Sequence, residues 1–169
     1  ERRSDLDVRV VDDADRALQL AEESTLVRAG AGTGDVPSTV TVRQLLSSVL
    51  HEGAAVDALV PHLRRIEAAA GDTLIREGDP PPGLFLLESG RLTAMLDRVG
   101  APVRLRSMLP GTMVGEISLY LDSAPTASVV ADVPSVAWCL GAAEFERIGR
   151  DDPLAAAAIH RFAAQVLAD

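Results

Sequence analysis

The spacing of hydrophobic residues changes several times along this chain. Residues 8–11 form a short β-prone run, and apolar residues then recur at i, i+3, i+4 and i+7 over residues 14–21. This pattern predicts a strand followed by a narrow, alanine-rich amphipathic helix, for which Asp12 and Asp13 provide an N-cap. Because such a helix is marginal alone, we expect its stripe to pack on another surface.

A segment without periodicity follows. Residues 29–38 concentrate glycine and proline, which predicts a linker. Gly30, Gly32 and Gly34 also raise the alternative of a phosphate-binding loop. Asp35 stands where a dinucleotide-binding loop needs its third glycine, and no Gly-Lys-Ser/Thr follows, so a flexible hinge is the favoured interpretation.

Periodicity of the helical type returns at residue 41. Residues 41–44 match a capping box, and Val42, Leu45, Leu46, Val49 and Leu50 form a full amphipathic stripe. Gly53 is expected to end this helix. Residues 54–59 predict a shorter helical piece, which Pro61 interrupts.

From residue 64 the pattern becomes one of short strands divided by glycine and proline turns. The expected strands are 64–68, 73–76, 84–87, 92–96, 103–108, 127–131 and 135–140. Residues 142–150 then predict a helix, and a last helix starts at Pro153. We therefore predict an α+β fold, in which an antiparallel, jelly-roll-like β-roll is flanked by N-terminal helices and two C-terminal helices.

Composition restricts the partners of this segment. The formal net charge is −9, so binding to nucleic acid is not expected. No apolar run reaches the ~18 residues of a membrane helix, and the N-terminus lacks a signal peptide, so we expect a soluble segment, with any membrane part upstream of Glu1. Cys139 is the only cysteine and is interpreted as a packed strand thiol in a reducing compartment.

The sequence contains no recognisable catalytic or metal-binding motif. His51, His62 and His160 are scattered without metal-ligand spacing, so we expect surface or interface roles and no metal site. Nucleophile-elbow, zinc-protease and P-loop motifs are absent, although a catalytic carboxylate pair stays open. We therefore predict a protein that is not an enzyme and requires no cofactor.

Two groups of residues carry a resemblance to a known family. Residues 70–79 and 84–90 resemble the first strands of the cyclic nucleotide-binding domain family, because several glycine turns fall in step. Residues 110–119 and 126–131 resemble its phosphate-binding cassette. The resemblance extends from Val40 to Asp169, and we assign residues 39–169 to a domain of this kind.

The resemblance implies a ligand site, and this chain departs from the family pattern at one position of that site. Its candidate residues are Gly115, Glu116, Ile117, Ser118, Pro125, Thr126 and Ala127. In the family, backbone amides of the cassette hold the cyclic phosphate, and the glutamate, here Glu116, binds the ribose hydroxyl. The family's phosphate-binding arginine is replaced by Pro125, so weak or absent binding of cAMP or cGMP is expected. A solvated turn carboxylate is the alternative interpretation of Glu116.

Three further expectations concern residues around this site. Arg104 or Arg106 could replace the missing charge, but both alternate with apolar residues on one strand, and an outward, solvated face is favoured. A pocket that has lost its anion site and survives as a scaffold is the plainer alternative. Phe162 and Val166 of the last helix either pack on the roll or form a lid over the ligand, and packing is favoured in the free state.

The first residues of the chain indicate the kind of larger protein to which it belongs. Residues 10–18 resemble the end of the STAS domain of bacterial SulP-type anion permeases, some of which carry a β-roll of this kind after it. Residues 1–28 are thus assigned to a STAS-like end, residues 29–38 to a linker, and the whole to a regulatory tail at the cytoplasmic face of the membrane. Its partners would be the STAS and membrane transport domains of the same chain, and a homodimer through the parent protein stays open.

Two other functions compete with the permease tail. The sensory domain of a catabolite-activator-type transcription regulator uses the same β-roll, but needs a basic helix-turn-helix. The C-terminal part here has only Arg147, Arg150 and Arg161 as bases. The other competitor is a ligand-free scaffold or interaction module.

Overall fold

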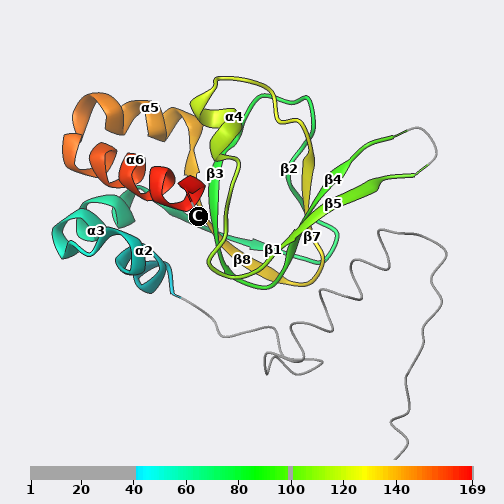
Figure 1. Cartoon of the computed structure of the whole chain (residues 1–169), viewed down its shortest axis with the longest axis horizontal. Coiled ribbons are helices and arrows are strands. Elements are labelled where there is room, and N and C mark those ends of the chain that lie inside the picture. Colours follow the sequence, from blue (N-terminus) through cyan, green and yellow to red (C-terminus); the bar gives the residue numbers. More distant parts are fainter. Residues whose placement is uncertain (1–40, 99–100, 169) are drawn as a thin grey trace, which may run out of the picture. The chain divides into compact units, whose positions relative to one another are not determined.

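A computed structural model of the chain describes residues 41–98 and 101–168 (Figure 1). The predicted STAS-like segment 1–28 and the linker 29–38 lie outside these ranges, so both stay predictions. None of the helices within them combines the length and the apolar character that crossing a bilayer requires.

The described chain runs from helices through a β-roll back to helices. In order, the elements are α2 (Val42–Leu50), α3 (Gly53–Leu59), the 3-10 turn η1 (Val60–His62), β1 (Arg64–Ala68), β2 (Thr73–Ile75), β3 (Gly83–Ser89), β4 (Leu92–Leu96), β5 (Val103–Met108), β6 (Met113–Val114), α4 (Glu116–Tyr120), β7 (Ser128–Ala131), β8 (Ser135–Gly141), α5 (Ala142–Asp151) and α6 (Pro153–Ala168). The predicted α+β architecture, a β-roll between N-terminal and C-terminal helices, is confirmed.

Two antiparallel sheets of four strands build the roll. One sheet has the order β1-β8-β3-β6 and the other the order β2-β7-β4-β5. Apolar side chains from both sheets meet in one buried cluster, which we call the inter-sheet core: Ala68, Ile75, Phe85, Leu87, Leu92, Met108, Val114, Val129, Ala131, Ala137 and Cys139. Cys139 is thus a packed strand thiol, as expected, and burial raises its pKa.

Strand β3 separates this core from a second one. Leu84 and Leu86 belong to the cluster that the sheet forms with α2, α3, α5 and α6, which we call the helical core. Phe85 and Leu87 belong to the inter-sheet core. Successive side chains of a strand point to opposite faces, so a strand buried on both faces needs the unbroken apolar run that β3 has. The helices therefore cover the outer face of the β1-β8-β3-β6 sheet, on one side of the roll (Figure 1).

Element boundaries agree closely with the sequence pattern, with two exceptions. The capping box of Thr41 and Gln44 is present at the start of α2. Gly53 does not end that helix: His51 does, with a left-handed φ of 56°, and Gly53 is the first residue of α3. The two-residue strand β6 was not predicted, because two residues are too few to show alternation.

Candidate functional site

The cassette begins at the point where the short strand β6 ends and helix α4 starts. Val114 pairs with Phe85 and faces the inter-sheet core, and Gly115 then turns the chain with φ 86°. A Cβ on Gly115 would lie 2.5 Å from the carbonyl oxygen of Gly83 and 2.9 Å from Cδ1 of Ile75. Both the backbone angle and the space therefore require glycine, and they fix the direction in which α4 leaves the sheet.

Glu116, the first residue of α4, holds an unsatisfied acceptor. Among the described residues nothing donates a hydrogen bond to its buried Oε2. Burial raises the pKa of this carboxyl group, while its own backbone amide and the nearby Arg106 act in the opposite direction. A buried acceptor without a donor costs free energy, which a hydroxyl or amine of a ligand could recover. The pocket interpretation of Glu116 is therefore favoured over a solvated turn.

The other predicted site residues form the remainder of the cassette and its return to the sheet. Ile117 on α4 is exposed, and Ser118 beside it is half-buried. After the loop, Thr126 is exposed, and Ala127 is half-buried directly before β7. Apart from Ile117, whose large apolar side chain is exposed, these residues have small side chains, and none of the four carries a charge.

Pro125 is tied into the structure through its backbone. It is buried, and its carbonyl oxygen accepts a hydrogen bond of 2.9 Å from the amide of Gly78. One residue earlier, the amide of Glu77 donates to Oγ of Ser128 over 2.9 Å. The turn between β2 and β3 thus holds the returning end of the cassette in place, at a position where proline offers no cation to an anionic ligand.

The two arginines of β5 lie on opposite faces of their sheet. Ala94 of β4 pairs with Arg106, but its neighbour Met95 pairs with Arg104, so Leu105 is the extra residue of a β-bulge. A bulge reverses the alternation of side chains beyond it. Without it, the two arginines would share a face, as the sequence pattern suggested.

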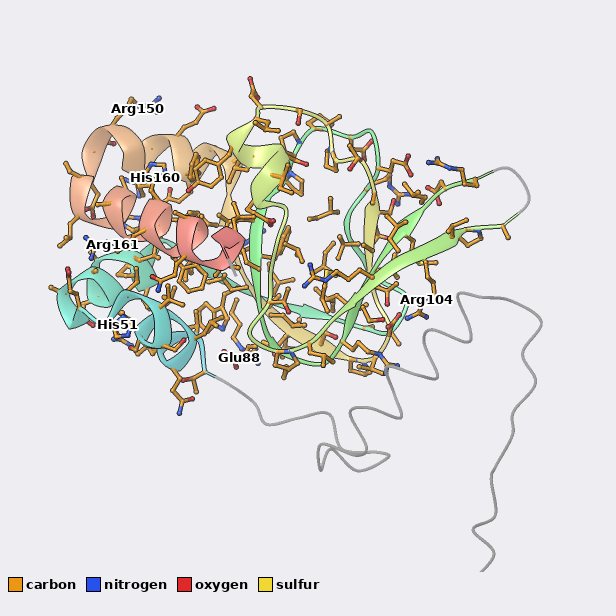
Figure 2. All side chains as sticks on the ribbon, viewed as in Figure 1. His51, Glu88, Arg104, Arg150, His160 and Arg161 are labelled. Atoms are coloured by element: carbon orange, nitrogen blue, oxygen red, sulfur yellow. The ribbon has the colours of Figure 1, made fainter. Side chains whose placement is uncertain are left out.

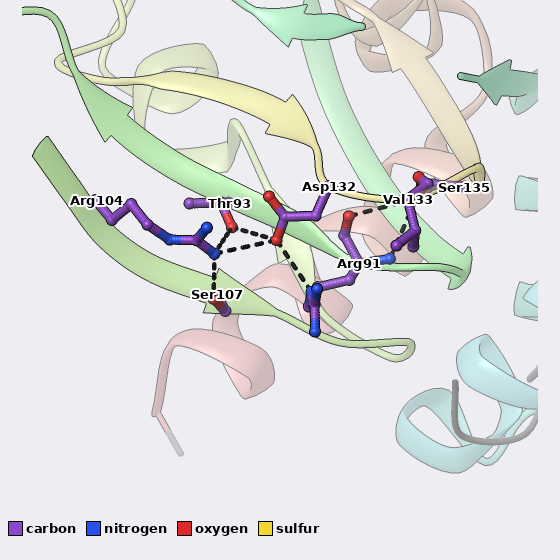
Figure 3. Close-up of polar contacts among 7 residues, drawn as sticks. All are labelled: Arg91, Thr93, Arg104, Ser107, Asp132, Val133 and Ser135. Atoms are coloured by element: carbon purple, nitrogen blue, oxygen red, sulfur yellow. Dashed lines mark hydrogen bonds and ion pairs between the residues drawn. The ribbon is translucent and has the colours of Figure 1, made fainter. Parts of the chain in front are cut away.

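The side chain of Arg104 forms part of a polar cluster on the outer face (Figure 3). Its guanidinium donates to Oγ1 of Thr93 over 2.8 Å, to Oγ of Ser107 over 3.2 Å and to Asp132 over 3.1 Å. Asp132 also pairs with Arg91 over 3.0 Å. The expected outward direction therefore holds for Arg104, which has no free charge to offer a ligand. Arg106 is exposed to solvent, as expected, but its direction differs from the expected one, because the bulge turns it to the inner face.

An aromatic contact that no sequence pattern indicates joins the cassette to the C-terminal helices. Tyr120, at the end of α4, makes an edge-to-face contact with Phe145 of α5, with ring centroids 5.2 Å apart. Its hydroxyl group lies 2.9 Å from Nδ1 of His160 on α6. The ring of His160 in turn lies 5.6 Å from that of Phe145. Figure 2 shows His160 on the helical side of the domain and Arg104 on the β4–β5 side.

The helices behind this contact are held by packing and by one charged cluster. Phe162 is fully buried in the helical core, and Val166 packs against the same core, as expected for the free state. The lid function of these two residues stays a prediction. Nδ1 of His62 lies 2.6 Å from Oε1 of Glu144, and its Nε2 lies 3.3 Å from Oδ2 of Asp152, so His62 joins η1 to α5 and to the start of α6. His62 and His160 thus occupy interfaces between elements.

Comparisons with known proteins agree with this geometry. A family model described as cyclic nucleotide-binding domain matches residues 65–152. The acetyltransferase Pat of Mycolicibacterium smegmatis is 38% identical over 85 residues, which make up 50% of this chain and 26% of that protein. Glutaminase 1 of Bradyrhizobium diazoefficiens is 32% identical over 160 residues, 92% of this chain and 24% of that protein. The chain thus spans about a quarter of the length of these relatives.

The fold also matches a solved structure. A cyclic nucleotide-binding domain from Methylobacillus flagellatus superposes with a TM-score of 0.64, covering 75% of this chain and 74% of that one at 21% identity. At that identity the likeness concerns the fold alone, and the family assignment comes from the sequence match. The order of strands, the glycine-led cassette and the match over residues 65–152 agree, and the chain belongs to the cyclic nucleotide-binding domain family.

Proposed function

We propose that this chain is a non-enzymatic regulatory domain whose cyclic-nucleotide site binds cAMP and cGMP weakly or not at all. One observation carries the proposal. The cassette keeps its acceptor, Glu116 with a buried and unpaired Oε2, but a buried proline, Pro125, occupies the position of the family's arginine. The site is therefore equipped for a hydroxyl donor and lacks the usual partner of a phosphate.

The expected loss of affinity follows from this missing charge. Removing one member of a buried, hydrogen-bonded charge pair costs about 2–5 kcal/mol. At about 1.4 kcal/mol for each factor of ten, this corresponds to a roughly thirtyfold to several-thousandfold weaker complex. Isothermal titration of residues 1–169 with cAMP and with cGMP tests the proposal. Tight binding of either nucleotide by the unaltered chain contradicts it.

We further propose that the domain regulates a larger protein, as the cytosolic tail of a SulP-type anion permease. The support is the resemblance of residues 10–18 to the end of a STAS domain. Its partners would then be the STAS and transport domains of the same chain, at the cytoplasmic face of the membrane. Reading the parent gene tests this context, which requires about ten or more apolar spans upstream of Glu1.

A second context is favoured by one comparison. The match to Glutaminase 1 covers 92% of this chain, so it reaches well into residues 1–40 and includes much of the segment assigned to the STAS-like end. A regulatory domain attached to an enzyme of that kind therefore accounts for the same sequence. A parent gene without membrane spans, but with an enzyme domain upstream, decides for this alternative, and a helix-turn-helix downstream decides for a transcription regulator.

A further inference from the structure

The pairing of strands places Arg106 on the inner face of the roll. Residues directly opposite each other in an antiparallel pair share a face, and Arg106 is opposite Ala94, which is in turn opposite Val129. Val129 belongs to the inter-sheet core, and Ala94 packs against it. Two residues further along β5, Met108 is also in that core. The guanidinium group of Arg106 therefore extends from the face that looks toward the other sheet.

Arg106 differs from its neighbours in having a charge that is not already paired. Arg91 and Arg104 both form ion pairs with Asp132 on the outer face. Across residues 41–98 and 101–168, no carboxylate lies within ion-pairing distance of Arg106, and the residue is exposed. Its charge is thus available on the inner face.

The carboxyl group of Glu116 lies near enough to Arg106 to be affected by its charge. The charge of Arg106 lowers the pKa of the Glu116 carboxyl group, against the larger effect of burial, although the two groups form no salt bridge. An acceptor without a donor, on Glu116, and a cation without an anion, on Arg106, thus lie near enough for their charges to interact. A ligand that joins a hydroxyl donor to an anionic group would satisfy both, as a phosphorylated sugar or nucleotide does.

We propose that Arg106 supplies the positive charge of the ligand site, reaching the anionic group of the ligand from β5 in place of the arginine that Pro125 replaces in the cassette. This inference rests on the proposed function, because it concerns the same site. Arg106 is exposed, so its contact is partly screened by solvent, which agrees with a weak complex. Its chemistry selects phosphate esters over uncharged nucleosides.

The test compares cAMP with adenosine, which has the same base and ribose hydroxyl groups but no phosphate. NMR titration of residues 1–169 to millimolar ligand measures both affinities in the unaltered chain, in Arg106→Gln and in Arg106→Lys. Arg104→Gln is the matched control, an arginine of the same strand on the outer face. Thermal unfolding shows that each variant is folded.

We expect Arg106→Gln to weaken cAMP about tenfold or more and to leave adenosine unchanged. Arg106→Lys should stay within a few-fold of the unaltered chain, and Arg104→Gln within about twofold. Raising the salt should weaken cAMP in the unaltered chain but much less in Arg106→Gln, because the screened charge is then absent. A purely structural role of Arg106 would not change this salt dependence.

Two results overturn the inference, and they separate it from the proposed function. Equal cAMP affinity of Arg106→Gln and Arg104→Gln rejects Arg106 as the ligand's partner. Absence of any cAMP binding to the unaltered chain also rejects it, while the proposed function, which allows an empty site, stands. Tight cAMP binding that Arg106→Gln abolishes gives the reverse outcome, supporting Arg106 and rejecting a weak site.

Discussion

The hydroxyl group of Tyr120 lies 2.9 Å from Nδ1 of His160, and so connects the cassette helix α4 directly to the C-terminal helix α6. The two residues are 40 positions apart in the sequence. The phenol of Tyr120 is protonated at neutral pH, and burial raises its pKa further, to about 12. It can therefore donate a hydrogen bond to Nδ1 in the tautomer of His160 that carries its proton on Nε2. A movement of α4 on ligand binding would therefore reach α6 through this contact.

Replacing Tyr120 with phenylalanine tests the strength of this connection. Tyr120→Phe keeps the edge-to-face contact with Phe145 but removes the hydrogen bond to His160. We expect a loss of about 0.5–1.5 kcal/mol in the free energy of unfolding, measured by urea denaturation. Leu121→Ala is the control, because that residue of the same segment is 69% exposed. Equal stability of Tyr120→Phe and the unaltered chain shows that the bond contributes nothing.

Glu116 should make the free domain less stable as the pH rises. Its pKa is raised above 4.5 in the folded chain, chiefly by burial, so the folded state binds the proton more tightly than the unfolded state does. Its stabilising effect is complete below the unfolded pKa and disappears as the pH rises through the folded pKa. Glu116→Gln should therefore be more stable than the unaltered chain at pH 7, with the difference shrinking below about pH 4.

Thermal unfolding of both chains between pH 3 and pH 8 measures this effect. The matched control is Glu146→Gln, at an exposed glutamate of α5. If both substitutions give the same pH profile, the buried environment of Glu116 has no consequence for stability. The same Glu116→Gln chain should bind nucleotide less well, since a carboxylate is the better acceptor.

Gly115 should tolerate no side chain. Alanine there would combine a φ of 86° with a Cβ only 2.5 Å from the carbonyl oxygen of Gly83. We expect Gly115→Ala to lower the free energy of unfolding by about 2 kcal/mol or more. Gly149→Ala is the matched control, because that glycine lies inside α5 with open space around it, and it should stabilise the chain by about 0.5–1 kcal/mol. If Gly115→Ala leaves the free energy of unfolding unchanged, α4 can move enough to accommodate the added side chain.

A chain that starts at Ser38 should fold without the preceding segment. Within residues 41–98 and 101–168, residues between Val42 and Val166 build two hydrophobic cores, the helical core and the inter-sheet core. A domain with its own hydrophobic core folds independently as a rule. We expect residues 38–169 to unfold in one cooperative transition in urea, followed by the fluorescence of Trp138. A non-cooperative transition would show that the first 37 residues belong to the same folding unit.

Sequence pattern alone located every described strand except the two-residue β6, because each of the others alternates or is largely apolar and is followed by a glycine or proline turn. It failed where a single residue changes the local rule. His51 adopts a left-handed conformation that usually indicates glycine, which is why the end of α2 was misplaced. Leu105 forms the bulge that places Arg104 and Arg106 on opposite faces of the sheet. The pattern of polar and apolar residues does not indicate where a strand contains one extra residue.

The site was predictable only as far as its local motif extends. Gly115 and Glu116 are adjacent in sequence and were identified from the cassette. The contact of Tyr120 with His160 depends on how α4 and α6 pack, and a tyrosine in a short helix gives no sign of its distant partner. The orientation of Arg106 similarly depends on strand register, which a bulge alters without changing the composition of the strand.

Restoring an arginine at Pro125 should restore affinity for cAMP. The carbonyl oxygen of Pro125 is held by the amide of Gly78, and an arginine with a similar backbone conformation keeps this bond while adding a cation and an N–H group. We expect Pro125→Arg to bind cAMP about tenfold or more tightly than the unaltered chain and to bind adenosine equally. Pro125→Gln is the control, since it removes the proline without adding charge, and calorimetry measures all three chains.

The double variant Pro125→Arg with Arg106→Gln then separates the two sources of charge. If Arg106 serves the phosphate in the unaltered chain, an arginine at position 125 should make it largely dispensable, so Arg106→Gln should cost less affinity in the Pro125→Arg background than alone. Equal costs in both backgrounds would mean that the two positions act on different parts of the ligand. No gain from Pro125→Arg over Pro125→Gln would show that the missing cassette arginine does not limit binding, and that the shape of the inner face does.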